Sequence, residues 1–256
     1  MHLSVITAAR GHEADALRLW AGGPFAEHDW LWKSLCGAPD TTPDFLFRRW
    51  DIEGVPRLFV LTPQKPLPQG EAWEMKTRDY APRLAAGTRL QFHVRANPTV
   101  IETRDGRSQR QDVVTRAKLR LLGERGFGSW EEWQAADKPT FQSLIREACG
   151  GWLNDRAARH GFQLHPQTVQ AEGYCQHEQD DSRTQLVESQ QTSYRTTRAP
   201  LGVSRMVRQR ADSGVPFSTV DLSGELTVVD PIMFAFALQR GIGRAKPFGC
   251  GLLLVE

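Results

Sequence analysis

Cysteine, lysine and long hydrophobic runs are all scarce in this sequence of 256 residues. The four cysteines (Cys36, Cys149, Cys175 and Cys250) are scattered and form no C-x-x-C pair. No stretch is apolar and long enough for a signal peptide or a membrane span. We therefore expect a cytoplasmic protein with reduced thiols and no membrane contact. A chain of this length can bury one large core or two smaller ones.

Metal binding is also disfavoured by the pattern of candidate ligands. A zinc set would have to combine His160, His165, Cys175 and His177. Their spacing matches no familiar zinc motif, and we expect separate strands to carry them. The sequence predicts neither a metal nor a cofactor.

Because lysine is scarce, arginine supplies most of the positive charge. Six of the 32 basic residues are lysines and 26 are arginines, although the formal net charge is only +2. Arginine presents a planar fork of donors that suits phosphates and guanine edges. Codon usage in a GC-rich genome produces the same bias, so it raises the expectation of nucleic-acid binding only slightly.

Hydrophobic alternation and turn signals predict a similar order of elements in each half of the chain. In the first half, strands are predicted at 3–8, 44–50, 55–61 and 73–80, and helices at 12–20 and 23–35. In the second half, strands are predicted at 89–95, 168–176, 183–188, 217–229 and 252–255, and helices at 140–160 and 231–239. Residues 97–118 are expected to form a protruding hairpin or loop. The order indicates an α+β fold of two units, residues 1–86 and 87–256.

A histidine lies in the middle of the apolar stripe of the helix predicted at 23–35. Phe25, Leu31, Trp32 and Leu35 share its side at 100° per residue, whereas Glu27, Asp29, Lys33 and Ser34 point away. From this window alone, a buried and hydrogen-bonded histidine is the more common explanation. The alternative is a catalytic imidazole at His28 that titrates near neutral pH.

A glycine-rich segment at 241–251 follows the last predicted helix. It contains Gly241, Gly243, Gly249 and Gly251, with Arg244 and Lys246 between the two glycine pairs. Glycine lets a backbone approach a ligand closely and adopt positive φ, and the two cations could bind a phosphate. The alternative is a tight helix-to-strand connection that needs glycine for packing. A dinucleotide fingerprint is disfavoured, because that motif follows a strand and opens a helix.

A basic segment at 189–211 contains no acidic residue. Its arginines are Arg195, Arg198, Arg205, Arg208 and Arg210. With hydroxyl groups and Tyr194 among them, the segment is typical of a chain laid along a phosphate backbone. A solvated surface loop is the alternative, and it also covers a weaker cluster formed by Arg104, Arg107 and Arg110.

Together these features resemble the CasE-type CRISPR repeat endoribonucleases, which are the RNA-processing subunits of type I-E Cascade. The matching motifs are the glycine segment 241–251, the GxLxVxD strand at 224–230, the RANP stretch at 95–98 and the histidine on an early helix. The resemblance extends over nearly the whole chain, from Leu3 to Val255. It implies two tandem ferredoxin-like (RRM-like) domains that face a basic cleft, with the histidine in the first and the glycine and basic segments in the second.

The resemblance also implies an activity and its residues. Such enzymes cut each CRISPR repeat at the base of its stem-loop without a metal and keep the product. His28 matches the catalytic histidine, and Lys33 matches a lysine seen near the scissile phosphate in some members. Phe25 occupies the position of a tyrosine that assists the histidine in several relatives, so this chain lacks that hydroxyl. The expected partners are CRISPR repeat RNA or the crRNA hairpin and the other Cascade subunits, with a monomer outside the complex.

The resulting hypothesis is attack by a ribose 2′-OH on the adjacent phosphorus, giving a 2′,3′-cyclic phosphate and a 5′-hydroxyl. His28 would act as general base or general acid. Lys33 would offset phosphoryl charge, while the basic and glycine segments hold the RNA bent. Two alternatives stay open: an RNA-binding subunit without activity, and a metabolic enzyme whose glycine segment binds a nucleotide phosphate.

Overall fold

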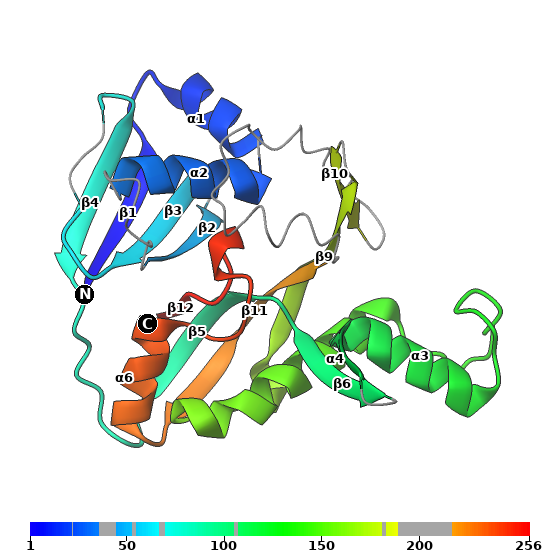
Figure 1. Cartoon of the computed structure of the whole chain (residues 1–256). Helices are drawn as coiled ribbons and strands as arrows, with labels where there is room; N and C mark the ends of the chain where they lie inside the picture. The colour runs from blue at the N-terminus through cyan, green and yellow to red at the C-terminus, as the bar shows by residue number, and fades with distance from the viewer. Residues whose placement is uncertain are drawn as a thin grey trace.

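Two antiparallel sheets organise the chain in a computed structural model, which describes residues 1–21, 23–35, 45–52, 55–66, 70–104, 107–180, 183–188 and 217–256 (Figure 1). The elements of the first half are β1 (His2–Ala8), α1 (Glu13–Ala21), α2 (Gly23–Leu35), β2 (Leu46–Ile52), β3 (Val55–Thr62) and β4 (Trp73–Asp79). Those around the second sheet are β5 (Arg89–Ala96), α4 (Phe141–Ala157), η1 (Ala158–His160), β8 (Phe162–Leu164), η2 (Pro166–Thr168), β9 (Gln170–Asp180), β10 (Arg183–Glu188), β11 (Phe217–Val228), α6 (Pro231–Arg240), η3 (Lys246–Phe248) and β12 (Leu253–Val255). A separate hairpin and helix are β6 (Thr99–Arg104), β7 (Arg107–Asp112) and α3 (Val113–Arg125).

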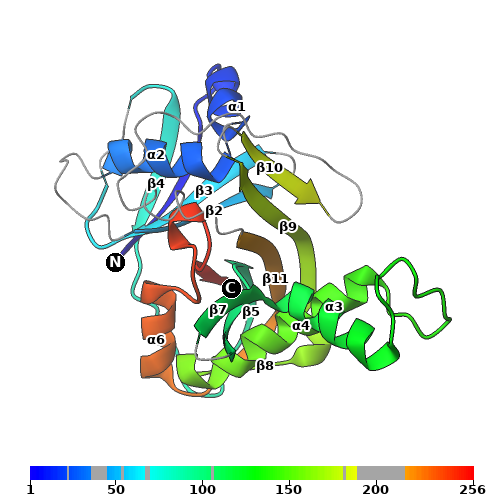
Figure 2. The ribbon, with the colours of Figure 1, turned by 45° about the vertical axis from the view of Figure 1, so that its right-hand side comes forward.

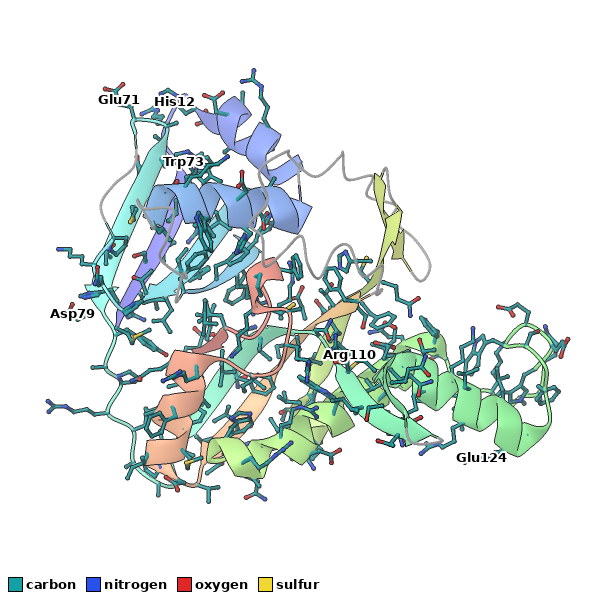
Figure 3. All side chains as sticks on the ribbon, viewed as in Figure 1. His12, Glu71, Trp73, Asp79, Arg110 and Glu124 are labelled. Atoms are coloured by element: carbon teal, nitrogen blue, oxygen red, sulfur yellow. The ribbon has the colours of Figure 1, made fainter. Side chains whose placement is uncertain are left out.

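The first sheet has the strand order β2-β3-β1-β4. The predicted hairpin is confirmed, because β2 and β3 pair antiparallel up to the Ile52–Val55 pair. Helix α2 packs on this sheet through Leu31, which is fully buried against Ile6 and Phe47. At the β4 edge of the sheet, the ring of Trp30 of α2 contacts that of Trp73 of β4 in a tilted arrangement, with centroids 4.6 Å apart. Trp73 is labelled in Figure 3.

The second sheet repeats this arrangement. Its order is β10-β9-β11-β5-β12, so the four strands β9-β11-β5-β12 correspond to β2-β3-β1-β4 in both order and antiparallel pairing. Helix α4 buries Leu144, Ile145 and Trp152 against it, and α6 buries Phe234 and Leu238. Both halves thus have the split βαβ arrangement of ferredoxin-like folds, which confirms the predicted tandem α+β architecture.

One helix was missing from the sequence prediction. The hairpin expected within 97–118 is present as β6 and β7, but residues 113–125 form α3. Asp112 caps this helix by accepting a hydrogen bond from the Thr115 backbone N–H, and Gly126 ends it at φ 75°. Only Val113, Val114 and Leu122 are buried in α3, so its sequence lacks the continuous apolar stripe that predicts a helix. Helix α3 extends to one side of the molecule (Figure 1).

Strand β2 connects the two halves of the protein. Arg48 of β2 donates from Nη2 to Asp221 Oδ1 of β11 at 3.1 Å, and Asp221 also accepts two hydrogen bonds from Arg95 of β5. Trp50 of β2 contacts His93 of β5, with ring centroids 4.4 Å apart. The two sheets therefore share one packed interface. The proposed division between residues 86 and 87 falls in the connection from β4 to β5 and stays a prediction.

The Asp221 carboxylate is the only anion that pairs with Arg48 in the described part of the chain. The Arg48 guanidinium is 4 % exposed, and its Nε and Nη1 groups have no hydrogen-bond partner there. An Asp221→Ala change leaves that buried cation unpaired. We therefore expect a loss of about 3 to 5 kcal/mol in the free energy of unfolding, measured by denaturant titration.

The control for this prediction is Asp15→Ala, which removes the exposed pair between Asp15 and Arg18. Its effect is expected to stay below about 1 kcal/mol, because solvent screens exposed ion pairs. Equal effects of the two substitutions would contradict the importance assigned to Asp221.

Candidate active site

His28 lies where α2 contacts β2. Its ring centroid is 5.9 Å from those of Trp32 and Phe45 and 6.4 Å from that of Phe47. The residue is 5 % exposed, and no hydrogen bond joins its ring to another described residue. Burial lowers the pKa of His28 below its ordinary value of 6.5, and the charge of Asp29 opposes this shift. The imidazole is therefore neutral at pH 7 and can accept a proton.

The rest of the predicted stripe holds only in part. Leu31 is buried as expected, but the prediction that Glu27 points away is wrong, because Glu27 is 4 % exposed. The Glu27 carboxylate accepts a hydrogen bond from Nη1 of Arg49 on β2 at 3.3 Å. Burial raises the pKa of Glu27, and the positive charge of Arg49 acts in the opposite direction. A partner 22 residues away compensates the buried charge, and no helical periodicity reveals such a partner.

Lys33 lies on the solvent side of α2, as predicted. Its side chain is 67 % exposed, and Nζ donates to Asp29 Oδ2 at 2.7 Å. The structure therefore pairs Lys33 with Asp29 rather than bringing it against the His28 ring. Phe25 lies on the same helix, and its side chain is outside the part that the structure describes.

The glycine segment packs beside the histidine. Helix α2 and strand β2 both contact η3, which lies within this segment. A Cβ atom added at Gly249 would lie 3.3 Å from Cε2 of Phe47, the same ring that contacts His28. Two parts of the chain that the sequence separates by more than 200 residues thus meet at one aromatic side chain. The predicted histidine helix and the predicted glycine segment therefore lie side by side and form one candidate site.

The conformation of the glycine segment explains its composition. Gly241 and Gly251 have φ of 71° and 93°, and a Cβ at either would lie within 3 Å of a backbone oxygen across the loop. A Cβ at Gly243 would come within 3.2 Å of the Trp152 ring. These glycines therefore serve the tight helix-to-strand connection that the sequence left as an alternative. Contact between their backbone and RNA stays a prediction.

The predicted RNA-binding cations are distributed over several surfaces. Arg244 is exposed on the glycine segment, whereas Lys246 donates from Nζ to the Arg240 carbonyl oxygen at 2.5 Å. Arg110 is exposed on β7, apart from α2 (Figure 3), and Arg107 begins the same strand. Arg195, Arg198, Arg205, Arg208 and Arg210 lie outside the described residues, so the basic cleft stays a prediction.

An aromatic stack that the sequence analysis missed joins the flank of the basic segment to this site. Phe217 begins β11 directly after the undescribed residues, and its ring lies 4.8 Å from that of Phe248 in η3. His177 of β9 stacks on the other side of Phe217 at 4.4 Å. Figure 2 shows β9 and β10 extending beyond the remaining strands of their sheet. In the sequence, the signal for this stack was Phe248, an aromatic residue within a glycine-rich turn.

The remaining candidate ligands point elsewhere. His165 and His177 bond through Nε2 to the hydroxyls of Thr227 and Thr219, respectively. Across the described ranges, no group of three or more His, Cys, Asp or Glu side chains is arranged to hold a metal ion. None of the helices described has the length and apolarity needed to cross a membrane.

The whole chain, residues 1–256, matches the family described as CRISPR associated protein. The chain belongs to this family. This chain is 24 % identical to the Cascade subunit CasE of Escherichia coli strain K12 over 258 residues, which cover 99 % of this chain and 98 % of that protein.

Solved structures of other CRISPR proteins share its fold. A CRISPR endoribonuclease Cse3 bound to a 19-nucleotide RNA matches with a TM-score of 0.60 and 20 % identity, covering 99 % of this chain and 98 % of that one. Thermus thermophilus Cse3 bound to an RNA that represents a pre-cleavage complex matches with a TM-score of 0.58 and 21 % identity, covering 100 % and 98 %. Cas6e from Escherichia coli K-12 gives 0.53 and 18 %, with the same coverage.

The buried His177 makes the stability of this CRISPR associated protein depend on pH. Burial, with a smaller contribution from the charge of Arg95, lowers the pKa of His177 from 6.5 to about 4. Between these two pKa values the unfolded chain binds a proton that the folded chain does not. The contribution of His177 to the free energy of unfolding is therefore fully present above pH 6.5 and is lost as the pH falls toward 4. We expect this group to remove about 3 kcal/mol over that window.

Denaturant unfolding of the wild-type chain and of His177→Gln at pH 7 and pH 4.5 measures this effect. The substitution is expected to reduce the pH dependence, since glutamine does not titrate. An identical loss of stability in both proteins would show that His177 is not responsible.

Proposed function

We propose that this CRISPR associated protein is an endoribonuclease that cleaves CRISPR repeat RNA at the base of its stem-loop and retains the product for a Cascade complex. The observation that carries the proposal is that His28 and the glycine segment meet at Phe47 in a tandem ferredoxin-like fold. The names of its relatives describe a Cascade subunit and endoribonucleases bound to RNA. We propose the same partners here, RNA and other Cascade subunits, and a monomer outside the complex.

The proposed reaction is a transesterification that uses no metal. Neutral His28 accepts the proton of a ribose 2′-OH, whose oxygen forms a bond to the adjacent phosphorus. The bond from phosphorus to the 5′ oxygen breaks, and that oxygen takes up a proton. The products are a 2′,3′-cyclic phosphate and a 5′-hydroxyl end. One general base of this kind contributes about 10² to 10⁴ in rate, and positioning of the RNA supplies the rest.

The aromatic side chains around His28 set a condition on this mechanism. With 5 % of its surface exposed, the residue reaches a 2′-OH only after a neighbouring side chain moves. Trp32 and Phe45 are part-exposed, whereas Phe47 is buried, so we expect RNA binding to displace one of these two rings.

Lys33 and the other cations have supporting roles in the proposal. The long exposed side chain of Lys33 can leave Asp29 to offset phosphoryl charge. Arg244 and Lys246 would bind phosphates next to the glycine segment. Recognition would extend to Arg107, Arg110 and the arginines of residues 195–210 and would rest on RNA shape and unpaired flanks, because A-form stems hide their major-groove edges.

A second candidate function is RNA binding without cleavage. Two observations favour it: the burial of the His28 ring and the phenylalanine at position 25. Both candidates predict tight binding of the repeat hairpin, so only a cleavage assay separates them.

The decisive experiment compares the wild-type chain with His28→Ala on labelled repeat RNA in EDTA. We expect the substitution to remove cleavage, a loss of at least about 100-fold, because no general base is left at this position. Affinity for an RNA with a 2′-deoxy group at the cleavage site is expected to change by less than about threefold. Undiminished cleavage by His28→Ala would overturn the catalytic assignment, and no cleavage by the wild-type chain would favour the binding subunit.

The pH dependence of single-turnover cleavage tests the role of His28 as a base. Burial lowers the pKa of His28, so the imidazole is already in its reactive neutral form near pH 7. The rate is expected to be constant above that pH and to fall on acidification, with a midpoint below 6.5. A rate that rises as the pH falls would identify His28 as the general acid instead.

A further inference from the structure

Glu27, the residue directly before His28, contacts the same strand as the histidine does. Glu27 accepts a hydrogen bond from Arg49, and His28 packs on Phe45 and Phe47, so both contacts are made to alternate residues of β2 and its N-terminal flank. Alternate residues of a strand point to the same face of the sheet. Two consecutive residues of α2 are thus fixed to one row of side chains.

Arg49 is itself held in a defined orientation. Its Nε donates to Asp51 Oδ1 at 2.9 Å, and its Nη2 donates to Asp51 Oδ2 at 3.2 Å. Such a two-point contact fixes the plane of a guanidinium group. The remaining nitrogen, Nη1, points to Glu27 at 3.3 Å. The carboxylate of Glu27 therefore contacts a cation that cannot rotate freely.

We propose that Glu27 is a positioning residue for the cleavage reaction. Its ion pair with Arg49 fixes the rotation of α2 about the helix axis and so holds the imidazole of His28 beside Phe47, the ring that Gly249 also approaches. This inference rests on the proposed function, since it requires that His28 act on RNA.

A direct catalytic role for Glu27 does not fit the structure. Glu27 is 4 % exposed, and its carboxylate already accepts a hydrogen bond from Arg49, so it does not reach a substrate. A purely structural role is disfavoured as well. Leu31 already anchors α2 in the apolar cluster of the first sheet. A buried ion pair contributes little net stability compared with apolar packing, which favours a geometric role for the charges.

The expected effect is a loss of rate without a loss of binding. A displacement of about 1 Å at a reacting group can cost about 100-fold in rate. We expect Glu27→Ala to lower the single-turnover rate about 100-fold, and the isosteric Glu27→Gln, which keeps an acceptor for Arg49, about tenfold. Affinity for the 2′-deoxy repeat RNA is expected to stay within about threefold of the wild-type value for both.

A double-mutant cycle with Arg49→Ala provides the decisive readout. If the pair acts as one unit, Arg49→Ala alone lowers the rate as much as Glu27→Ala, and the double variant is no slower than either. The matched control is Glu225→Ala, which removes the pair between Arg89 and Glu225 on the second sheet and is expected to leave the rate unchanged.

Three results would overturn the inference. Additive losses, together with Glu27→Gln as slow as Glu27→Ala, would indicate that the carboxylate itself takes part in the chemistry. Parallel losses of rate, RNA affinity and thermal stability would indicate a structural role. Wild-type rates in all Glu27 and Arg49 variants, with His28→Ala inactive, would reject the positioning role alone, whereas an active His28→Ala variant would reject the proposed function as well.

Discussion

The alternation of side chains along β2 is the constraint on which the rest of the structure depends. Phe47 and Arg49 face α2, where they contact His28 and Glu27, while Arg48 and Trp50 face the second sheet. One strand thus supplies both the support for the histidine helix and the contact between the two halves. Because side chains alternate with a period of two, a shift of one residue in the pairing of β2 with β3 would exchange these two sets. The register of β2 therefore determines the geometry of the candidate site.

Most of the fold could be predicted from the sequence, because its strands alternate regularly and its turns carry glycine and proline. The hairpin of β2 and β3, the helix at 23–35 and most strands of the second half follow from such local signals. Helix α3 was missed because its basic residues surround only three buried positions. In that case the capping of the helix by Asp112 carried more information than its hydrophobic pattern.

The candidate site was less predictable than the fold, because its contacts are long-range. Hydrophobic patterning assigns a charged residue to the surface, and this rule failed at Glu27 because its partner lies on another element. The glycine segment was recognisable from composition, but composition does not distinguish a ligand-binding loop from a packed one. In the structure, Gly249 and Gly243 have positive φ and lie tightly against Phe47 and Trp152, so packing and backbone conformation both favour glycine there. The meeting of that segment with His28 depends on tertiary structure and has no local signal.

The sharing of Asp221 by Arg48 and Arg95 has a consequence for how this interface can evolve. Loss of Asp221 leaves both arginines without their shared counterpart, whereas loss of either arginine leaves Asp221 paired with the other, so substitution of Asp221 alone is the most strongly selected against. Simultaneous replacement of all three by apolar residues removes the charges together and is tolerated far better. Homologues that lack the carboxylate at position 221 are therefore expected to lack both arginines as well.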